Sequence, residues 1–257
     1  MIATGGIRRA TDWLWRLREA REPRAGTVVL LPFAGGSAYS LPEWPLHLPP
    51  GPQVLSVQYP GRGPRFNDGP PESVAAMAAE VAADLEAVDG GPLTLLGHSM
   101  GAVVGYEVAW IFEQQGRPAT QLVVTAARPP HTRLEPEPLH EYPHDRLVAA
   151  LRERGGLPQE ALDSDELMEM LLPVIRADFR LVAGYRCGRS ERRLATPIVA
   201  AGGDADPAVP TDVLRRWLEV AASECDVHVF SGGHFFYPPH MPALAAIVAR
   251  RLPEATF

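Results

Sequence analysis

The sequence predicts an α/β fold, with a mostly parallel central sheet, helices on both faces and an inserted helical lid. Short apolar runs alternate with stretches of helical periodicity along the chain, which is typical of parallel sheets. The alternation stops between residues 125 and 197, where prolines and helical patterns replace the strands. The composition, 46% hydrophobic and 21% charged residues, is that of a globular protein.

Six runs are predicted as buried strands because each is short, rich in aliphatic or β-branched residues and bounded by Gly, Pro or polar residues. They are residues 27–31, 54–57, 93–96, 122–125, 198–201 and 227–230. Apolar residues recur at helical spacing within residues 74–88 and 244–252. Helices that connect parallel strands cover both faces of the sheet.

Residues from about 128 to 185 are predicted to form the lid. Prolines crowd residues 128–143, and helical patterns follow at residues 145–154 and 165–185. A structureless connection of this length would be improbable, so we expect residues 1–257 to form one α/β domain with an inserted lid. The apolar residues of the second pattern are expected to roof an apolar chamber; they are Leu167, Met168, Met170, Leu171, Val174, Ile175 and Phe179.

The charged residues exclude several chemistries. All 24 basic residues are arginines, so a P-loop lysine and imine chemistry are excluded. The net charge of −7, with no dense basic run, argues against a nucleic-acid partner. Cys187 and Cys225 have no metal-ligand spacing, and no apolar run could form a signal peptide or a membrane span. We expect a cytoplasmic protein without metal, cofactor or membrane contact.

Gly97-His98-Ser99-Met100-Gly101 is the strongest chemical signal. It directly follows a predicted strand and precedes a helical stretch, as in a nucleophile elbow. There the serine adopts a strained conformation, and the flanking glycines let the helix and the strand approach. The N–H of Met100 would face a developing oxyanion. We expect Ser99 to be a nucleophile; the alternative is a Gly-rich turn with a surface serine.

A serine nucleophile needs a general base, and we expect His234 in that role. The loop at residues 231–233 follows a strand and can present the imidazole at the carboxyl edge of the sheet. The partner carboxylate is expected to be Asp206, with Asp204 as the alternative, since a loop needs a few residues to swing a carboxylate toward His234. The order Ser99, Asp206, His234 is that of the α/β-hydrolase fold.

The first predicted strand runs into a Gly-rich loop at residues 32–37. This loop matches no GxGxxG or P-loop pattern. Beside a nucleophilic serine we expect it to supply a second oxyanion N–H, from Ala34, although an ordinary turn would have the same composition.

In their order, these motifs resemble the type II, stand-alone editing thioesterases of polyketide and nonribosomal peptide biosynthesis. Besides the elbow, the resemblance rests on Trp13 and Trp15, Pro32-Phe33-Ala34-Gly35-Gly36, Tyr59-Pro60-Gly61-Arg62-Gly63-Pro64-Arg65, Leu172-Pro173-Val174-Ile175-Arg176-Ala177-Asp178, Gly203-Asp204-Ala205-Asp206-Pro207 and Gly232-Gly233-His234-Phe235-Phe236. Phe33 departs from the pattern, since many relatives resemble Pro-His-Ala-Gly-Gly there. The departure changes a side chain only, so we expect the N–H of Ala34 to stay in place.

The resemblance implies hydrolysis of acyl groups from the phosphopantetheine thiol of acyl or peptidyl carrier proteins, which clears stalled or wrongly primed chains. Two alternatives stay open. One is another serine hydrolase of this fold: a carboxylesterase, a medium-chain fatty acyl thioesterase or a chain-terminating cyclase. The other is a non-catalytic binding protein, against which the intact set of Ser99, Asp206 and His234 argues.

An acidic carrier protein would need a positive patch on this acidic chain. We expect the patch among the arginines between the lid and the next strand, with internal ion pairs as the alternative. They are Arg176, Arg180, Arg186, Arg189, Arg192 and Arg193.

Overall fold

The computed structural model describes residues 6–22, 25–88, 91–132, 137–187 and 192–252. Within these residues, a sheet of eight strands has the order β1-β2-β4-β3-β5-β6-β7-β8. Strands β3 to β8 are parallel, and β1 and β2 pair antiparallel at one edge. The predicted α/β fold with a mostly parallel sheet is confirmed.

All six predicted strands are present, but the last of them lies at the edge of the sheet and its residues are partly or fully exposed, so it is not buried as predicted. They are β3 (Thr27–Leu31), β4 (Gln53–Val57), β5 (Leu93–His98), β6 (Gln121–Thr125), β7 (Ile198–Gly203) and β8 (Cys225–Phe230). Because these six strands all run in the same direction, their carboxyl ends meet at one edge of the sheet. This edge carries the ends of β5, β7 and β8, where the predicted catalytic residues lie.

Two strands escaped prediction, β1 (Arg8–Arg9) and β2 (Leu14–Arg18). Arginines interrupt the apolar residues of β2, so the segment does not read as a buried strand. The structure accommodates Arg18 by hydrogen bonds from its guanidinium to the carbonyls of Pro45, Leu48, Pro49 and Pro52. The strand therefore rests on long-range backbone contacts that a local pattern does not contain.

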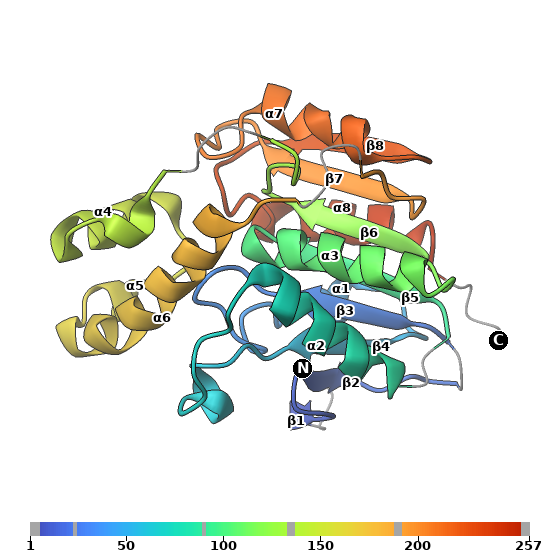
Figure 1. The fold of residues 1–257 in the computed structure, drawn as a ribbon, viewed down its shortest axis with the longest axis horizontal. Coiled ribbons are helices and arrows are strands. Elements are labelled where there is room, and N and C mark those ends of the chain that lie inside the picture. The colour runs from blue at the N-terminus through green and yellow to red at the C-terminus, as the bar shows by residue number, and fades with distance from the viewer. Residues whose placement is uncertain (1–5, 23–24, 89–90, 133–136, 188–191, 253–257) are drawn as a thin grey trace.

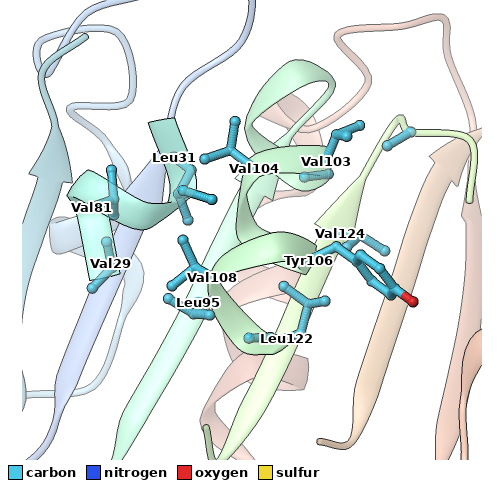
Figure 2. Packing of buried hydrophobic residues seen from close by; sticks show 14 of the residues in the cluster. Val29, Leu31, Val81, Leu95, Val103, Val104, Tyr106, Val108, Leu122 and Val124 are labelled. Atoms are coloured by element: carbon cyan, nitrogen blue, oxygen red, sulfur yellow. The ribbon is translucent and has the colours of Figure 1, made fainter. Parts of the chain in front are cut away.

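Alternate side chains of each strand face opposite helical layers. Leu31, Leu95 and Leu122 pack beneath α2 (Val74–Glu86) and α3 (Met100–Gln114), as Figure 2 shows around Val104 and Val108. The other face packs against α1 (Trp44–His47) and α8 (Met241–Ala249). In Figure 1, α2 and α3 lie in front of the sheet and α1 and α8 lie behind it. This sandwich fixes the strand ends that carry the site.

In the described part of the segment between β6 and β7 there are three α-helices, α4 (His144–Arg154), α5 (Gln159–Leu162) and α6 (Asp165–Gly184). They project beyond one end of the sheet (Figure 1). They have an apolar cluster of their own, formed by Leu139, Leu147, Leu151, Leu162, Met168, Leu172 and Ile175. The two helical patterns predicted for the lid correspond to α4 and α6.

The remaining short elements are α7 (Thr211–Arg215) and the 3₁₀ turns Gly63–Arg65, Leu139–Glu141, Arg216–Val220 and Pro238–His240. No helix in the described ranges is long and apolar enough to cross a bilayer. The same ranges hold no group of three or more His, Cys, Asp or Glu side chains arranged to bind a metal ion.

Candidate active site

Ser99 lies between the last residue of β5 and the first residue of α3, half-buried at the carboxyl edge of the sheet. Its backbone has φ 53° and ψ −115°, a strained conformation for a residue with a side chain. The N–H of Ser99 donates to the carbonyl of Thr125 in β6 at 2.8 Å, which ties the turn to the neighbouring strand. The strain predicted for a nucleophile elbow is present.

Two glycines make this turn sterically feasible. A Cβ on Gly97 would lie 2.3 Å from the carbonyl oxygen of Gly101, and a Cβ on Gly101 would lie 1.9 Å from that of Leu31. Both distances are far shorter than a van der Waals contact. Glycine at these positions therefore lets α3 start directly against β3 and β5.

The side chains of Ser99, His234 and Asp206 form one chain of hydrogen bonds. The Oγ of Ser99 lies 3.0 Å from Nε2 of His234, and Nδ1 of His234 lies 2.8 Å from Oδ2 of Asp206. An ionised carboxylate only accepts hydrogen bonds, so Nδ1 carries the proton and Nε2 is left to accept from Ser99. The three residues predicted from separate loops are thus in contact, in the geometry of a nucleophile, a base and an orienting acid.

The carboxylate of Asp206 is buried, and burial by itself opposes its ionisation. The hydrogen bond and charge of His234, with the backbone N–H groups of Ala208 and Val209, outweigh burial and lower the pKa of Asp206 below its ordinary value. The N–H of Ala208 donates to Oδ1 at 2.9 Å. Asp206 therefore carries its negative charge at neutral pH.

Asp204, the alternative carboxylate, is exposed and has a different contact. Its Oδ1 accepts from the N–H of Gly232 at 2.9 Å, and its own N–H donates to the carbonyl of Phe230 at 2.8 Å. These bonds join the loop after β7 to the loop that precedes His234. Asp204 therefore holds the loop of His234, whereas Asp206 holds its imidazole.

His98, beside the nucleophile in sequence, is buried under the imidazole of His234. Its Nδ1 lies 2.9 Å from Oγ1 of Thr125, whose hydroxyl donates to the carbonyl of Gly97, so Nδ1 is the donor. Its Nε2 has no hydrogen-bond partner among the described residues. Burial, with a smaller contribution from His234, lowers the pKa of His98 well below 6.5. A neutral, buried His98 supports the ring of His234 without contributing charge.

Two backbone N–H groups are placed to stabilise an oxyanion. Met100 is the first residue of α3, where N–H groups have no intrahelical acceptor. Ala34 lies in a turn closed by a 2.8 Å hydrogen bond from Gly36 N–H to the carbonyl of Phe33. Both residues line one cavity with Ser99 and His234. The two residues predicted to supply oxyanion donors therefore lie at the same cavity as Ser99, and their role as donors stays a prediction.

The cavity above Ser99 has a volume of about 410 Å³. Side chains of α6 (Phe179, Val182 and Ala183) form one wall, and Arg128, Glu137 and Arg154 add charge to the lining. Among the apolar residues expected to roof the chamber, only Phe179 lines it, so that expectation was largely wrong. Leu167 and Met170 are exposed, and Met168 and Ile175 pack in the cluster that α6 forms with α4 and α5.

Comparison with known proteins identifies the family. The sequence matches the thioesterase domain family over residues 26–252. The chain belongs to this family. It is 35% identical in sequence to the type II thioesterase BorB from the borrelidin biosynthetic cluster, whose structure superposes with a TM-score of 0.87 over 95% of this chain and 99% of that one. The predicted resemblance to type II thioesterases, and the assignment to the hydrolases, are confirmed.

Two relatives from Streptomyces are also thioesterases by name. The chain is 32% identical over 243 residues to the probable cadicidin biosynthesis thioesterase of Streptomyces griseus, covering 95% of this chain and 66% of that protein. It is 35% identical over 227 residues to thioesterase PikA5 of Streptomyces venezuelae, covering 87% of this chain and 80% of that protein. The chain thus spans just under two thirds of the first relative.

The arginines expected to form a positive patch separate into two groups in this thioesterase. Arg176 donates to the carbonyl of His140 at 2.9 Å, and the guanidinium of Arg192 pairs with the buried carboxylate of Glu107 at 2.9 Å. Arg180, Arg186 and Arg193 are exposed and, within the described residues, have no acidic partner. Arg189 lies outside the described residues. A patch built from these arginines therefore consists of the three exposed ones.

One buried ion pair of this thioesterase received no role from the sequence analysis. Arg62 and Asp178 occur in two of the motifs that carry the resemblance, and in the structure they form a buried ion pair beside the turn that contains Ala34. The sequence offered one signal for this pair, which is that Asp178 is a charged residue among the apolar residues of the second helix predicted for the lid.

Proposed function

We propose that this thioesterase hydrolyses acyl groups from the phosphopantetheine thiol of acyl or peptidyl carrier proteins, and so removes aberrant or stalled acyl groups from a polyketide or nonribosomal peptide synthase. Ser99, His234 and Asp206 are its catalytic residues. The observation that supports the proposal is the continuous hydrogen-bonded chain from Asp206 through His234 to Ser99, at a cavity that is also lined by Ala34 and Met100. The enzyme acts in the cytoplasm as one domain, residues 1–257, with its lid at about residues 128–185.

In the first half of the reaction, Oγ of Ser99 attacks the thioester carbonyl carbon while Nε2 of His234 takes the hydroxyl proton. The carbonyl oxygen becomes an oxyanion held by the N–H groups of Ala34 and Met100. Asp206 stabilises the imidazolium and keeps its tautomer. The C–S bond then breaks, and His234 protonates the departing thiolate. A thiolate leaves more readily than an alkoxide because the pKa of its conjugate thiol is only about 8.5.

In the second half, water attacks the acyl ester on Ser99. Nε2 of His234 takes a proton from this water, and the same two N–H groups hold the second oxyanion. Collapse of this intermediate breaks the C–O bond to Ser99, returns the proton to Oγ and releases the carboxylic acid. The carrier keeps its free thiol, ready to be loaded again.

The test compares the same acyl groups on two different thiols. The kcat/KM values for acetyl, propionyl and malonyl groups are measured on a carrier protein and on coenzyme A, with Ser99→Ala as the blank. We expect at least a roughly tenfold preference for the carrier, since docking adds contacts that coenzyme A does not offer. Equal values on both thiols, or higher values on coenzyme A, would contradict a carrier-protein substrate and would instead favour a thioesterase or carboxylesterase that acts on free acyl substrates.

A further inference from the structure

We infer that Arg62 and Asp178 are positioning residues: their buried ion pair fixes the oxyanion turn, residues 33–36, against the wall of the acyl cavity. The inference rests on the proposed reaction at Ser99 and adds a function for two residues that do not touch the reacting atoms. It follows from three features: the pair's own contacts, its anchoring of the turn and its place on α6.

The pair is bidentate and almost completely buried. Nη1 of Arg62 lies 2.6 Å from Oδ2 of Asp178, and Nη2 lies 2.8 Å from Oδ1. Arg62 is 7% exposed and Asp178 is 1% exposed. Removing two charges from water is costly, and an apolar pair of similar size often stabilises a fold as well or better. Stability alone therefore does not account for a charged pair at this position.

Both members of the pair hold the oxyanion turn. Oδ2 of Asp178 accepts from the N–H of Gly35 at 2.7 Å, and Nη1 of Arg62 donates to the carbonyl of Gly36 at 3.2 Å. Gly35 has φ 79°, which suits the third position of a type II turn, and a Cβ there would lie 2.6 Å from Cγ1 of Ile175. The turn is thus bound to the pair and packed directly on α6.

The segment that carries Arg62 also holds the flanks of the turn. The hydroxyl of Tyr59 donates to the carbonyl of Pro32 at 3.2 Å, and Oε1 of Gln58 accepts from the N–H of Ala38 at 3.1 Å. Nε2 of Gln58 donates to the carbonyl of Arg62 at 3.0 Å, which fixes the backbone that presents the guanidinium. The Gln58–Arg62 segment therefore supports the turn on both sides.

These contacts assign different tasks to adjacent N–H groups. The N–H of Gly35 is occupied by Asp178, so it is not available to an oxyanion. The N–H of Ala34 has no hydrogen-bond acceptor among the described residues and lies in the lining of the cavity. Because Gly35 is held in place, the N–H of Ala34 is already oriented before an oxyanion forms. Such preorganisation makes an oxyanion donor effective.

The same carboxylate connects the turn to the acyl cavity. Asp178 is followed on α6 by Phe179, Val182 and Ala183, which form one wall of the cavity with Ser99. A rigid helix links this wall to the carboxylate that holds Gly35. The ion pair thus sets the position of the acyl wall relative to the oxyanion donor, and it couples a lid helix to the chemistry at Ser99.

The test replaces the pair with apolar residues, Arg62→Met with Asp178→Leu, which removes the acceptor of Gly35 without leaving a buried charge. The substrate is 4-nitrophenyl acetate, so the result does not depend on whether carrier proteins are substrates. Phenylboronic acid, which forms a tetrahedral adduct on a serine nucleophile, reports on the oxyanion site. We expect a roughly 10- to 100-fold loss in kcat and in boronic acid affinity, with KM within about twofold.

Two further double variants separate positioning from general damage. Arg62→Gln with Asp178→Asn leaves an amide oxygen for Gly35 and should recover most of the lost kcat. Arg192→Met with Glu107→Leu makes the same apolar exchange at a second buried arginine–carboxylate pair, 2.9 Å apart and away from the turn, and should keep the kcat of the wild type. An unchanged kcat in the first variant, or equal losses in all three, would overturn the inference.

A measurement on the wild-type protein keeps the inference testable if the apolar variant does not fold. Amide resonances are followed by NMR while phenylboronic acid is added. We expect the N–H resonances of Ala34 and Met100 to shift, since they meet the adduct oxygen, and that of Gly35 to stay near its starting position. A shift at Gly35 without one at Ala34 would mean that Asp178 does not reserve the N–H of Gly35, and the assignment would be wrong.

Discussion

Asp206 accepts a 2.8 Å hydrogen bond from the imidazole of His234. Asp204, two residues earlier, instead accepts from a backbone N–H of the loop that precedes His234. The arrangement divides two tasks between similar side chains. Asp206 fixes the tautomer of His234 by accepting from Nδ1, and Asp204 fixes the loop by accepting from the N–H of Gly232. The two aspartates therefore offer a matched pair of substitutions.

We expect Asp206→Asn to lower kcat by about 10⁴-fold, because an amide can donate to Nδ1 and stabilise the wrong tautomer of His234. Asp204→Asn makes the same chemical change in the same loop but keeps an oxygen for Gly232, so it should cost less than about tenfold. Steady-state kinetics on one thioester substrate measure both. The reverse ranking would show that the carboxylate roles are exchanged.

Much of this site could be predicted from local patterns. Ser99, Asp206 and His234 each closely follow an apolar run that was predicted as a strand, and parallel strands bring their carboxyl ends to the same edge of a sheet. The choice between Asp204 and Asp206 rested on loop length alone. The structure supplies the reason for it: the hydrogen bonds of Asp204 to Gly232 and Phe230 leave only the later residue in reach of the imidazole.

Other features lay beyond local patterns. Arg62 and Asp178 are 116 positions apart, and no periodicity links a loop after β4 to a helix inserted after β6. The prediction for the inward face of α6 was also wrong, because most of its apolar residues pack in the cluster with α4 and α5 and do not line the cavity. Helical spacing shows that a helix has an apolar face, but it does not show which neighbour that face meets.

The wall formed by α6 predicts a limit on acyl chain length. Ala183→Leu adds bulk to the cavity lining, so we expect at least a tenfold loss of kcat/KM for octanoyl relative to acetyl thioesters. Ala177→Leu is the matched control, since Ala177 lies on the same helix but lines a different pocket with Arg180 and Tyr185. Its chain-length profile should match the wild type. Identical profiles for both variants would show that α6 does not limit the acyl chain.

Buried His98 predicts a pH dependence of stability. Its folded-state pKa lies well below 6.5, so below about pH 6.5 the unfolded chain binds a proton that the folded chain does not. The free energy of unfolding should therefore fall as the pH drops from about 6.5 to about 5, with up to ~1.4 kcal/mol per pH unit from this residue. Urea unfolding of wild type and His98→Asn measures the difference in slope.

The asparagine variant should show the shallower slope, since it has no imidazole to protonate on unfolding. His47→Asn changes an exposed histidine and should keep the full slope. Parallel slopes for wild type and His98→Asn would contradict a neutral His98 in the folded protein.

The three exposed arginines near the lid predict where an acidic carrier protein docks. Replacing Arg180, Arg186 and Arg193 with Glu should raise KM for a carrier substrate roughly tenfold and leave kcat/KM on a small thioester unchanged. The matched control reverses Arg21, Arg117 and Arg250, which are also exposed. The control changes net charge by the same amount, so an equal rise in KM would indicate a general charge effect and no local docking surface.

The central claim, that Ser99 takes the acyl group from a carrier thioester, is tested most directly by rapid acid quench followed by peptide mass spectrometry. The enzyme is mixed with a carrier protein bearing a propionyl-phosphopantetheine arm and quenched within the first turnover. We predict a propionyl group on the peptide containing Ser99, none in Ser99→Ala, and loss of turnover on the order of 10⁶-fold in that variant. Release of the acid with no acyl group on Ser99, or with turnover retained by Ser99→Ala, would contradict the mechanism.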